Sequence, residues 1–219
     1  MAVDLRLYAL VDPAVAGGRT LPELALCIAD SATILQLRDK RGSARAMLDE
    51  ARALAAVLSP RGIPLLINDR VDVALAVQAN GVHIGQDDMP AADARRLLGR
   101  SAIIGLSVTT LQHAHEAPLE QLDYVAVGAV FATGSKNDAT RPIGLGGLRE
   151  IVRVIRARDP KCPICAISGI NDSNASDVIA AGTDGVAVIS ALSLALDPAG
   201  AARSLRTVVD EALQRRGQS

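Results

Sequence analysis

The sequence predicts a parallel α/β barrel of the (β/α)8, or TIM-barrel, type, formed as a single domain over residues 1–219. One observation is the alternation of short apolar runs with longer amphipathic ones, which repeats eight times without a long insertion. Another is the composition, which is 49% hydrophobic although the chain has only two Tyr, one Phe and no Trp. The core must therefore consist of Val, Ile, Leu and Ala, as is typical of buried parallel strands covered by Ala-rich helices. A chain of 219 residues suffices for one such core and is too short for two.

Each element follows from this alternation. Strands are expected, in chain order, at 5–11, 32–37, 64–67, 81–84, 102–106, 123–128, 163–168 and 184–189. Helices are expected at 21–30, 43–58, 71–79, 90–98, 110–117, 146–158, 172–181 and 198–215. Pro198 suits a first helical turn, and Gly182 suits the end of a helix before a strand. The alternative is a doubly wound open sheet, but the turn after the first strand, at 12–18, lacks the Gly-rich dinucleotide spacing.

Charge and composition exclude several classes of partner. The net charge of −1 and the pI of about 6.3 predict no basic face for nucleic acid or anionic membrane, and the scarcity of aromatic residues argues against base stacking. No apolar run approaches membrane-spanning length, and no basic-then-apolar leader opens the chain. Three sparse cysteines fit a reducing cytosol, and the spaced pair Cys162 and Cys165 leads into a strand rather than a helix, which favours a structural role. We therefore expect a cytoplasmic protein without nucleic-acid or membrane partners.

Two acidic residues, Asp69 and Asp88, each follow a strand-like run of the expected barrel. Because active sites of such barrels lie at the carboxyl ends of the strands, the two carboxylates are expected to converge on one cation. Mg²⁺ beside a substrate phosphate is usually held by one or two carboxylates and retained waters. The sequence therefore predicts a Mg²⁺ site, with Asp87 left as a competitor of Asp88. Taken alone, Asn68 or Asp69 would serve equally well as a helix cap.

Basic residues occur at equivalent strand ends, where they suit a diphosphate. Arg38 and Lys40 follow the second strand, and Lys136 lies in the long loop after the sixth. These cations are able to contact phosphate oxygens. Gln36 interrupts an apolar run, where its amide is expected to face inward and suits the edge of a heterocycle. Asp39 has the alternative role of orienting Arg38.

The later strand ends predict a second anion site, which needs no metal. Ser107 is a candidate donor to a phosphate or a ring nitrogen, and equally a candidate cap for the next helix. The loop at 128–138 suits a lid that wraps an anion. Gly169, Ile189 and Ser190 open onto helix N-termini, where backbone N–H groups bind phosphate in α/β barrels. A charged site beside an amide site indicates a two-substrate reaction in which a diphosphate leaves and a phosphomonoester is retained.

These motifs together resemble thiamine phosphate synthase. They are Gln36 to Lys40, Asn68 to Asp72, His83 to Pro90, Thr133 to Lys136 and Val188 to Ser190. The resemblance extends from about residue 5 to residue 210. It implies a transferase that joins 4-amino-2-methyl-5-hydroxymethylpyrimidine diphosphate to thiazole phosphate and releases diphosphate. It also implies a Mg²⁺-assisted dissociative reaction through a pyrimidine carbocation, which agrees with the absence of an evident nucleophile beside a base.

Carried over position by position, the resemblance gives each site residue a role. The pyrimidine diphosphate would be held by Gln36, Leu37, Arg38, Asp39, Lys40, Asn68, Ser107 and Lys136, of which Arg38, Ser107 and Lys136 would serve catalysis. Thiazole phosphate would be held by Thr133, Gly134, Ser135, Gly169, Ile189 and Ser190, and Mg²⁺ by Asp69 and Asp88. His83 is expected in the barrel interior rather than as a ligand. Homologous barrels often form dimers, so a homodimer is a further expectation.

Two positions depart from the family pattern. Ser168 stands where Gly is usual, and its side chain would either crowd the phosphate site or add a donor to it. Ala132 stands where Pro is common, which would loosen the loop.

Two other functions deserve weighing on the same barrel. A thiazole tautomerase tends to lose the second acidic residue and carries a His before the lid, whereas this chain has Asp88 and the segment 128–131 without His. A non-catalytic thiamine-phosphate-binding barrel would have little need of Mg²⁺. The metal pair favours the synthase over both.

Overall fold

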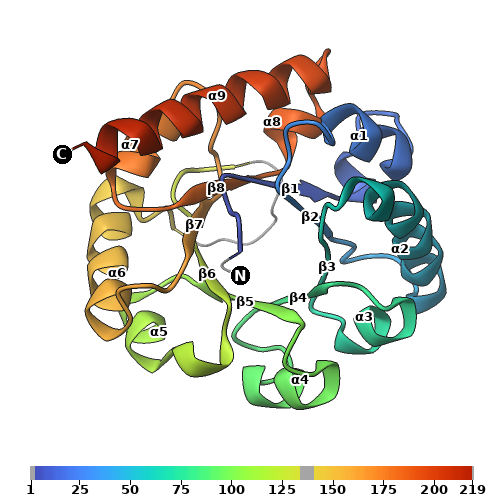
Figure 1. Ribbon diagram of the computed structural model, residues 1–219, viewed down its shortest axis with the longest axis horizontal. Coiled ribbons are helices and arrows are strands. Elements are labelled where there is room, and N and C mark those ends of the chain that lie inside the picture. Colours follow the sequence, from blue (N-terminus) through green and yellow to red (C-terminus); the bar gives the residue numbers. More distant parts are fainter. Residues whose placement is uncertain (1–2, 134–140, 219) are drawn as a thin grey trace.

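The computed structural model describes residues 3–133 and 141–218. Its strands are all parallel and close into a barrel in chain order, with the last strand pairing with the first (Figure 1). The strands are β1 (Leu7–Val11), β2 (Ile34–Leu37), β3 (Leu65–Asn68), β4 (Gly81–Ile84), β5 (Ile103–Val108), β6 (Tyr124–Val127), β7 (Ile164–Ile167) and β8 (Gly185–Val188). Each expected run overlaps one of these strands, although β3 and β5 extend one and two residues beyond the predicted ends at 67 and 106, so the predicted (β/α)8 barrel is confirmed.

Helices form a ring around the barrel (Figure 1). They are α1 (Leu21–Ile28), α2 (Ala44–Leu58), α3 (Val71–Val77), α4 (Ala91–Leu98), α5 (Leu111–Glu116), α6 (Gly144–Arg158), α7 (Ala175–Ala180), α8 (Ser190–Ser193) and α9 (Pro198–Gly217). Short 3-10 helices are η1 (Pro13–Val15), η2 (Ser59–Arg61) and η3 (Leu119–Gln121). The sequence did not predict α8 or the 3-10 helices, because three or four residues are too few to display a helical period.

Local sequence explains where these helices begin. Thr20 and Glu23 form a capping box at the start of α1, each side chain bonding the other residue's backbone N–H. Pro198 lies in the first turn of α9 as predicted, after Asp197, whose side chain accepts a hydrogen bond from the N–H of Gly200.

Side chains along each strand alternate between two layers of core. In β2, Leu35 and Leu37 belong to the apolar layer between strands and helices, whereas Ile34 belongs to the cluster inside the barrel. Gln36 shares the inward face with Ile34 and is 1% exposed. A two-residue period therefore places polar strand residues inside the barrel.

The interior is closed at the amino ends of the strands. Leu5 is 2% exposed and packs with Tyr8 and Leu10 in the interior cluster. In Figure 1 the N-terminal end of the chain lies within the ring of strands. Access to the interior is therefore expected from the carboxyl ends, as in other barrels of this type.

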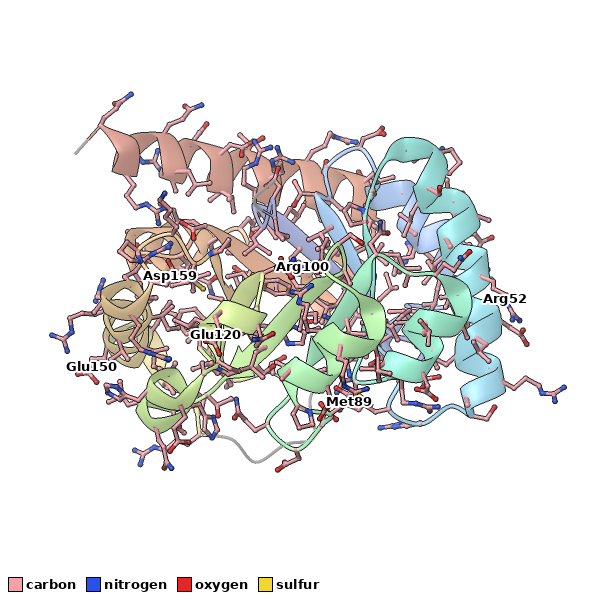
Figure 2. All side chains as sticks on the ribbon, turned by 60° about the horizontal axis from the view of Figure 1, so that its bottom comes forward. Arg52, Met89, Arg100, Glu120, Glu150 and Asp159 are labelled. Atoms are coloured by element: carbon pink, nitrogen blue, oxygen red, sulfur yellow. The ribbon has the colours of Figure 1, made fainter. Side chains whose placement is uncertain are left out.

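The outer helices carry the charged surface. Figure 2 shows Arg52 on α2 and Glu150 on α6 projecting outward from opposite sides of the barrel. Among the helices of the described residues, none is long and apolar enough to cross a membrane.

Candidate active site

A cavity of about 610 Å³ lies at the carboxyl ends of the strands. Its acidic and basic lining residues include Arg38, Lys40, Asp69, Asp87, Asp88 and Arg141. Its uncharged polar lining includes Asn68, Ser107, Thr133 and Ser168. The predicted metal ligands and the predicted diphosphate residues of the described chain thus share one cavity.

Asp69 follows β3 in a left-handed backbone conformation. Its φ is 63°, a region that Asp enters more readily than most residues. Burial raises the pKa of the Asp69 carboxyl, Lys40 lowers it and the neighbouring Asp88 raises it, so that it lies above its ordinary value. The helix-cap alternative is wrong, because the N-cap of α3 is Arg70, without a side-chain cap bond.

Asp88 is held by the backbone of its own loop. Its Oδ2 accepts a hydrogen bond of 2.6 Å from the N–H of Gly85. Asp87 also lines the cavity, but its side chain is exposed. Because Asp88 is the carboxyl that raises the pKa of Asp69, the two carboxylates that meet are Asp69 and Asp88.

The two basic residues after β2 are each paired with a carboxylate. Lys40 Nζ donates to Asp69 Oδ2, one of the two predicted metal ligands. Arg38 Nη1 donates to Asp12 Oδ2, and these side chains are only 13% and 4% exposed. A buried, paired guanidinium is fixed in direction, so Arg38 presents its remaining donors from a set position.

Asp12 is a site residue that the sequence did not single out. Besides pairing with Arg38, it accepts a hydrogen bond of 2.9 Å from the N–H of Ala14 at the start of η1. Asp39 accepts instead from the backbone N–H groups of Arg41 and Gly42. The alternative that Asp39 orients Arg38 is therefore wrong, and Asp12 performs that role.

Two amide side chains below the cavity each have one atom without a hydrogen-bond partner in the described chain. Gln36 and Asn68 line a small cavity of about 30 Å³ inside the barrel and are 1% and 7% exposed. Within the described residues, Gln36 Oε1 and Asn68 Nδ2 have no hydrogen-bond partner. A buried unpaired polar atom costs ~1–3 kcal/mol, so this acceptor and donor suit a ligand that supplies their partners.

Ser107 lies beside an imidazole, which the sequence did not reveal. Its Oγ is 2.8 Å from Nε2 of His83, whose Nδ1 is 2.8 Å from Tyr124 Oη. The sequence showed no hydroxyl beside a base, whereas the structure places the Ser107 hydroxyl next to His83. The predicted interior position of His83 is confirmed, because this residue is 7% exposed. The cap of α5 is Thr110, which accepts from the N–H of His113, so Ser107 is not the cap.

A second, narrow pocket of about 20 Å³ adjoins the large cavity at the ends of β7 and β8. Gly169, Ile189 and Ser190 line it, as predicted for the amide site. It shares Thr133 and Ser168 with the large cavity. In contrast with the large cavity, its described lining contains no charged side chain.

The backbone before the narrow pocket is left-handed at two successive residues. Gly169 has φ 68°, and a Cβ there would lie 2.6 Å from the carbonyl oxygen of Ala132. Ser168 has φ 86°, is 7% exposed, and its Oγ has no hydrogen-bond partner in the described chain. The positive φ gives a physical reason for glycine at position 168, and the serine there is a strained, unpaired residue.

The remaining predicted residues divide into two groups. Leu37 belongs to the outer core at 0% exposure, so its side chain does not reach the cavity. Gly134, Ser135 and Lys136 lie outside the described residues.

The cavity lining also includes polar residues that were not predicted, among them Arg141, Thr109 and His113. Arg141 follows the long loop, and Thr109 follows β5 directly and pairs with His113 at 2.9 Å. Both could have been predicted from their places in the sequence, because Arg141 is a cation shortly after the long loop and Thr109 is a hydroxyl residue directly after a strand.

The donor set fits Mg²⁺ better than a metal held entirely by protein. Among the described residues, no group of three or more His, Cys, Asp or Glu side chains is placed to hold an ion. Two converging carboxylates leave room for waters and substrate oxygens, which is how Mg²⁺ is usually bound.

Comparison with known proteins identifies close relatives over nearly the whole chain. The family model described as thiamine monophosphate synthase matches residues 7–192. The thiamine-phosphate synthase of Agrobacterium fabrum is 48% identical over 215 residues, which is 98% of each chain. That of Moorella thermoacetica is 48% identical over 207 residues, covering 94% of this chain and 96% of the relative.

Solved structures agree with this result. Thiamine phosphate pyrophosphorylase from Pyrococcus furiosus superposes with a TM-score of 0.83 at 37% identity, covering 96% of this chain and 98% of that one. The 3-hexulose-6-phosphate synthase of Salmonella typhimurium superposes with a TM-score of 0.70 at 19% identity, covering 95% and 100% of the two chains. The latter likeness is one of fold alone.

Proposed function

We propose that this chain, which belongs to the thiamine monophosphate synthase family, uses the two adjoining pockets as the two substrate sites of the family reaction. The chain is a transferase, and the family reaction joins a pyrimidine diphosphate to thiazole phosphate. We assign the two substrates to separate pockets because the site is divided into a cavity lined by charged side chains and a pocket whose described lining is uncharged.

The diphosphate would lie in the charged cavity. Asp69 and Asp88 would hold Mg²⁺, which when bound supplies positive charge to the leaving diphosphate. Arg38 and Lys40 would contact its oxygens, with Arg38 fixed in direction by Asp12. Lys40 already neutralises Asp69 in the structure and is half exposed, so it is able to turn toward a new anion.

Lys136 is proposed as a further cation on this diphosphate, on the family resemblance alone. It lies outside the described residues.

The pyrimidine would lie over the barrel interior. Gln36 Oε1 and Asn68 Nδ2 are an acceptor and a donor without partners in the described chain, which matches the amino group and ring nitrogen of an aminopyrimidine. Ser107 would add a hydroxyl from the wall. Leu37 and Asp39 would contribute only through their backbone, since the Leu37 side chain faces the helices and the Asp39 side chain caps a turn.

Thiazole phosphate would lie in the uncharged pocket. Backbone N–H groups at Gly169, Ile189 and Ser190 would hold its phosphate, because Ser190 begins α8 and the first N–H groups of a helix have no partner within it. Thr133 lines both pockets. Gly134 and Ser135, which lie outside the described residues, are proposed to contact thiazole phosphate on the family resemblance alone.

The chemistry that this arrangement favours is departure of the leaving group. The C–O bond between the pyrimidine methylene and the diphosphate breaks with its electron pair on the diphosphate, and the thiazole nitrogen then forms the new C–N bond. Cations and hydrogen-bond donors near the diphosphate stabilise the charge that develops as it leaves. The carbocation needs no enzyme nucleophile.

The two rival functions have less support. A thiazole tautomerase would not explain why Asp88 is held beside Asp69. A product-binding barrel would not need a second anion cavity rich in charge.

We also propose a cytoplasmic location and a homodimer. Cys27, Cys162 and Cys165 are all free thiols in the structure, as expected in a reducing compartment. Burial raises the pKa of Cys162 to about 11, so it serves as a structural residue. Light scattering of the purified protein would test the homodimer.

The direct test of the function is product formation. The purified chain with Mg²⁺ and both substrates should yield thiamine phosphate, detected by mass spectrometry. Absence of product from folded protein with Mg²⁺ and both substrates would contradict the proposal, and isomerisation of the thiazole carboxylate phosphate alone would favour the tautomerase.

A further inference from the structure

A row of hydrogen-bonded side chains crosses the barrel interior from Gln36 to the cavity. Gln36 Nε2 donates to Tyr8 Oη, which lies 2.7 Å from Tyr124 Oη. Tyr124 Oη lies 2.8 Å from His83 Nδ1, and His83 Nε2 lies 2.8 Å from Ser107 Oγ. We infer that this row is a one-directional relay that fixes the proton of His83 on Nε2 and so turns Ser107 into a hydrogen-bond donor toward the substrate.

The direction follows from the first member. An amide nitrogen only donates, so Tyr8 Oη accepts from Gln36. Among its hydrogen-bond partners in the described chain, Tyr124 Oη is then the one that is able to accept the Tyr8 proton, which assigns Tyr8 as the donor of this pair. Tyr124 Oη, having accepted, donates its proton to His83 Nδ1. A neutral imidazole that accepts at Nδ1 carries its proton on Nε2, and that proton goes to Ser107 Oγ. The hydroxyl proton of Ser107 is then directed away from His83.

Burial keeps this order in place. Tyr8 and Tyr124 are 1% and 0% exposed, so water does not offer an alternative partner. Burial also raises the pKa of both phenols far above its ordinary value, which keeps both hydroxyls protonated. The rings pack closely, with Tyr124 stacked on His83 at 5.6 Å and edge-on to Tyr8 at 5.6 Å.

Glycine at position 105 leaves space for the ring of Tyr124, the central member of the row. Gly105 faces Tyr124 across the β5–β6 ladder, and a Cβ on Gly105 would lie 2.0 Å from Tyr124 Cζ. A side chain at position 105 would therefore displace the ring that connects Tyr8 to His83.

The relay decides between two roles for the Ser107–His83 pair. A histidine that accepted at Nε2 would make Ser107 a nucleophile activated by a base. A histidine that donates at Nε2 makes Ser107 a donor, which suits a phosphate oxygen or a ring nitrogen. Resting on the function proposed above, we assign Ser107 to substrate contact and Tyr8, Tyr124 and His83 to positioning it.

The first test is the tautomer of His83, read from the nitrogen chemical shifts of its imidazole in ¹⁵N-labelled protein. The chain has three histidines, and loss of one signal set in His83→Gln assigns it. The relay predicts a protonated Nε2 and an unprotonated Nδ1 in the wild type. A proton on Nδ1 would reverse the relay and overturn the inference. This measurement needs no turnover, so it remains decisive even if the proposed reaction fails.

The second test asks whether Tyr124 acts through Ser107. Tyr124→Phe keeps the ring and removes the donor, and it should lower kcat/KM for the pyrimidine diphosphate about tenfold. In Ser107→Ala, which should itself cost more, the added Tyr124→Phe should have little further effect. An equal tenfold cost in both backgrounds would mean that Tyr124 only supports packing, and would overturn the inference.

A third variant, Tyr8→Phe, tests the relay even if Tyr124→Phe does not fold. Tyr8→Phe leaves the Tyr124–His83 bond intact but removes the group that sets its direction. The His83 nitrogen shifts should then move toward each other as both tautomers become populated. Unchanged shifts would show that Gln36 and Tyr8 do not set the direction, which contradicts the relay.

Discussion

The two pockets of the site differ in the charge of the side chains that line them. The large cavity brings together the acidic pair Asp69 and Asp88 and the basic residues Arg38 and Lys40. The narrow pocket is lined by backbone and small side chains, without a charged group among its described residues. One barrel therefore offers charged side chains at one set of strand ends and backbone dipoles at another.

In the proposed function, this difference corresponds to what each phosphate does in the reaction. A leaving diphosphate gains charge in the transition state, so ionic groups beside it accelerate the chemical step. A phosphomonoester that is kept gains no charge, and backbone N–H groups suffice to bind it. Substitutions in the charged cavity should therefore lower kcat, whereas those in the narrow pocket should raise KM for thiazole phosphate.

The largest effect is expected at the acidic pair. Asp69→Ala should lower turnover ~10³-fold, because it removes one of two carboxylates proposed to hold Mg²⁺. Asp87→Ala is the matched control, since Asp87 lines the same cavity but is exposed and does not raise the pKa of Asp69. Steady-state rates of both variants, with melting curves to show that both remain folded, check the prediction. Similar losses in the two would contradict the special role given to Asp69 over the exposed Asp87.

A smaller loss is expected from Lys40, which lines the charged cavity. Lys40→Gln should lower kcat/KM for the pyrimidine diphosphate ~10- to 100-fold through loss of a charge-assisted bond. Lys136→Ala should remove most turnover if its proposed contact with the diphosphate is correct. Arg41→Gln serves as control, because Arg41 is an exposed cation of the same loop and does not line the cavity. If Lys40→Gln raised KM for thiazole phosphate as much as KM for the pyrimidine diphosphate, the assignment of the two substrates to separate pockets would be contradicted.

The smallest effect is expected in the narrow pocket. Ser168→Gly should raise KM for thiazole phosphate only a few-fold, because it removes one donor from a site made of backbone amides. It should also stabilise the fold by ~1 kcal/mol, since glycine adopts φ 86° without strain. Ser168→Ala keeps the strain and removes the hydroxyl, so the pair separates the two effects in kinetics and chemical denaturation. A lower KM in Ser168→Gly would mean that the serine crowds the pocket.

The fold and the members of the site were largely readable from the sequence. Short apolar runs predicted the approximate position of every strand, and the rule that barrel sites lie at strand carboxyl ends predicted that Asp69, Asp88 and Arg38 lie together. The pairing of Asp12 with Arg38 could not be predicted from the sequence, because Asp12 follows β1 rather than β2 and has the sequence context of a turn residue. The relay from Gln36 to Ser107 was equally hidden, since it joins inward positions of β1, β2, β4, β5 and β6 that only the closed barrel brings into contact.

The most direct test of the two-pocket account is diphosphate release from the pyrimidine diphosphate, measured with and without thiazole phosphate and with Mg²⁺ or EDTA. The account predicts fast release only when Mg²⁺ and thiazole phosphate are both present, with loss of most of the rate in EDTA. Release that is equally fast in EDTA would contradict the role given to Asp69 and Asp88, and no release under any condition from folded protein would contradict the synthase assignment itself.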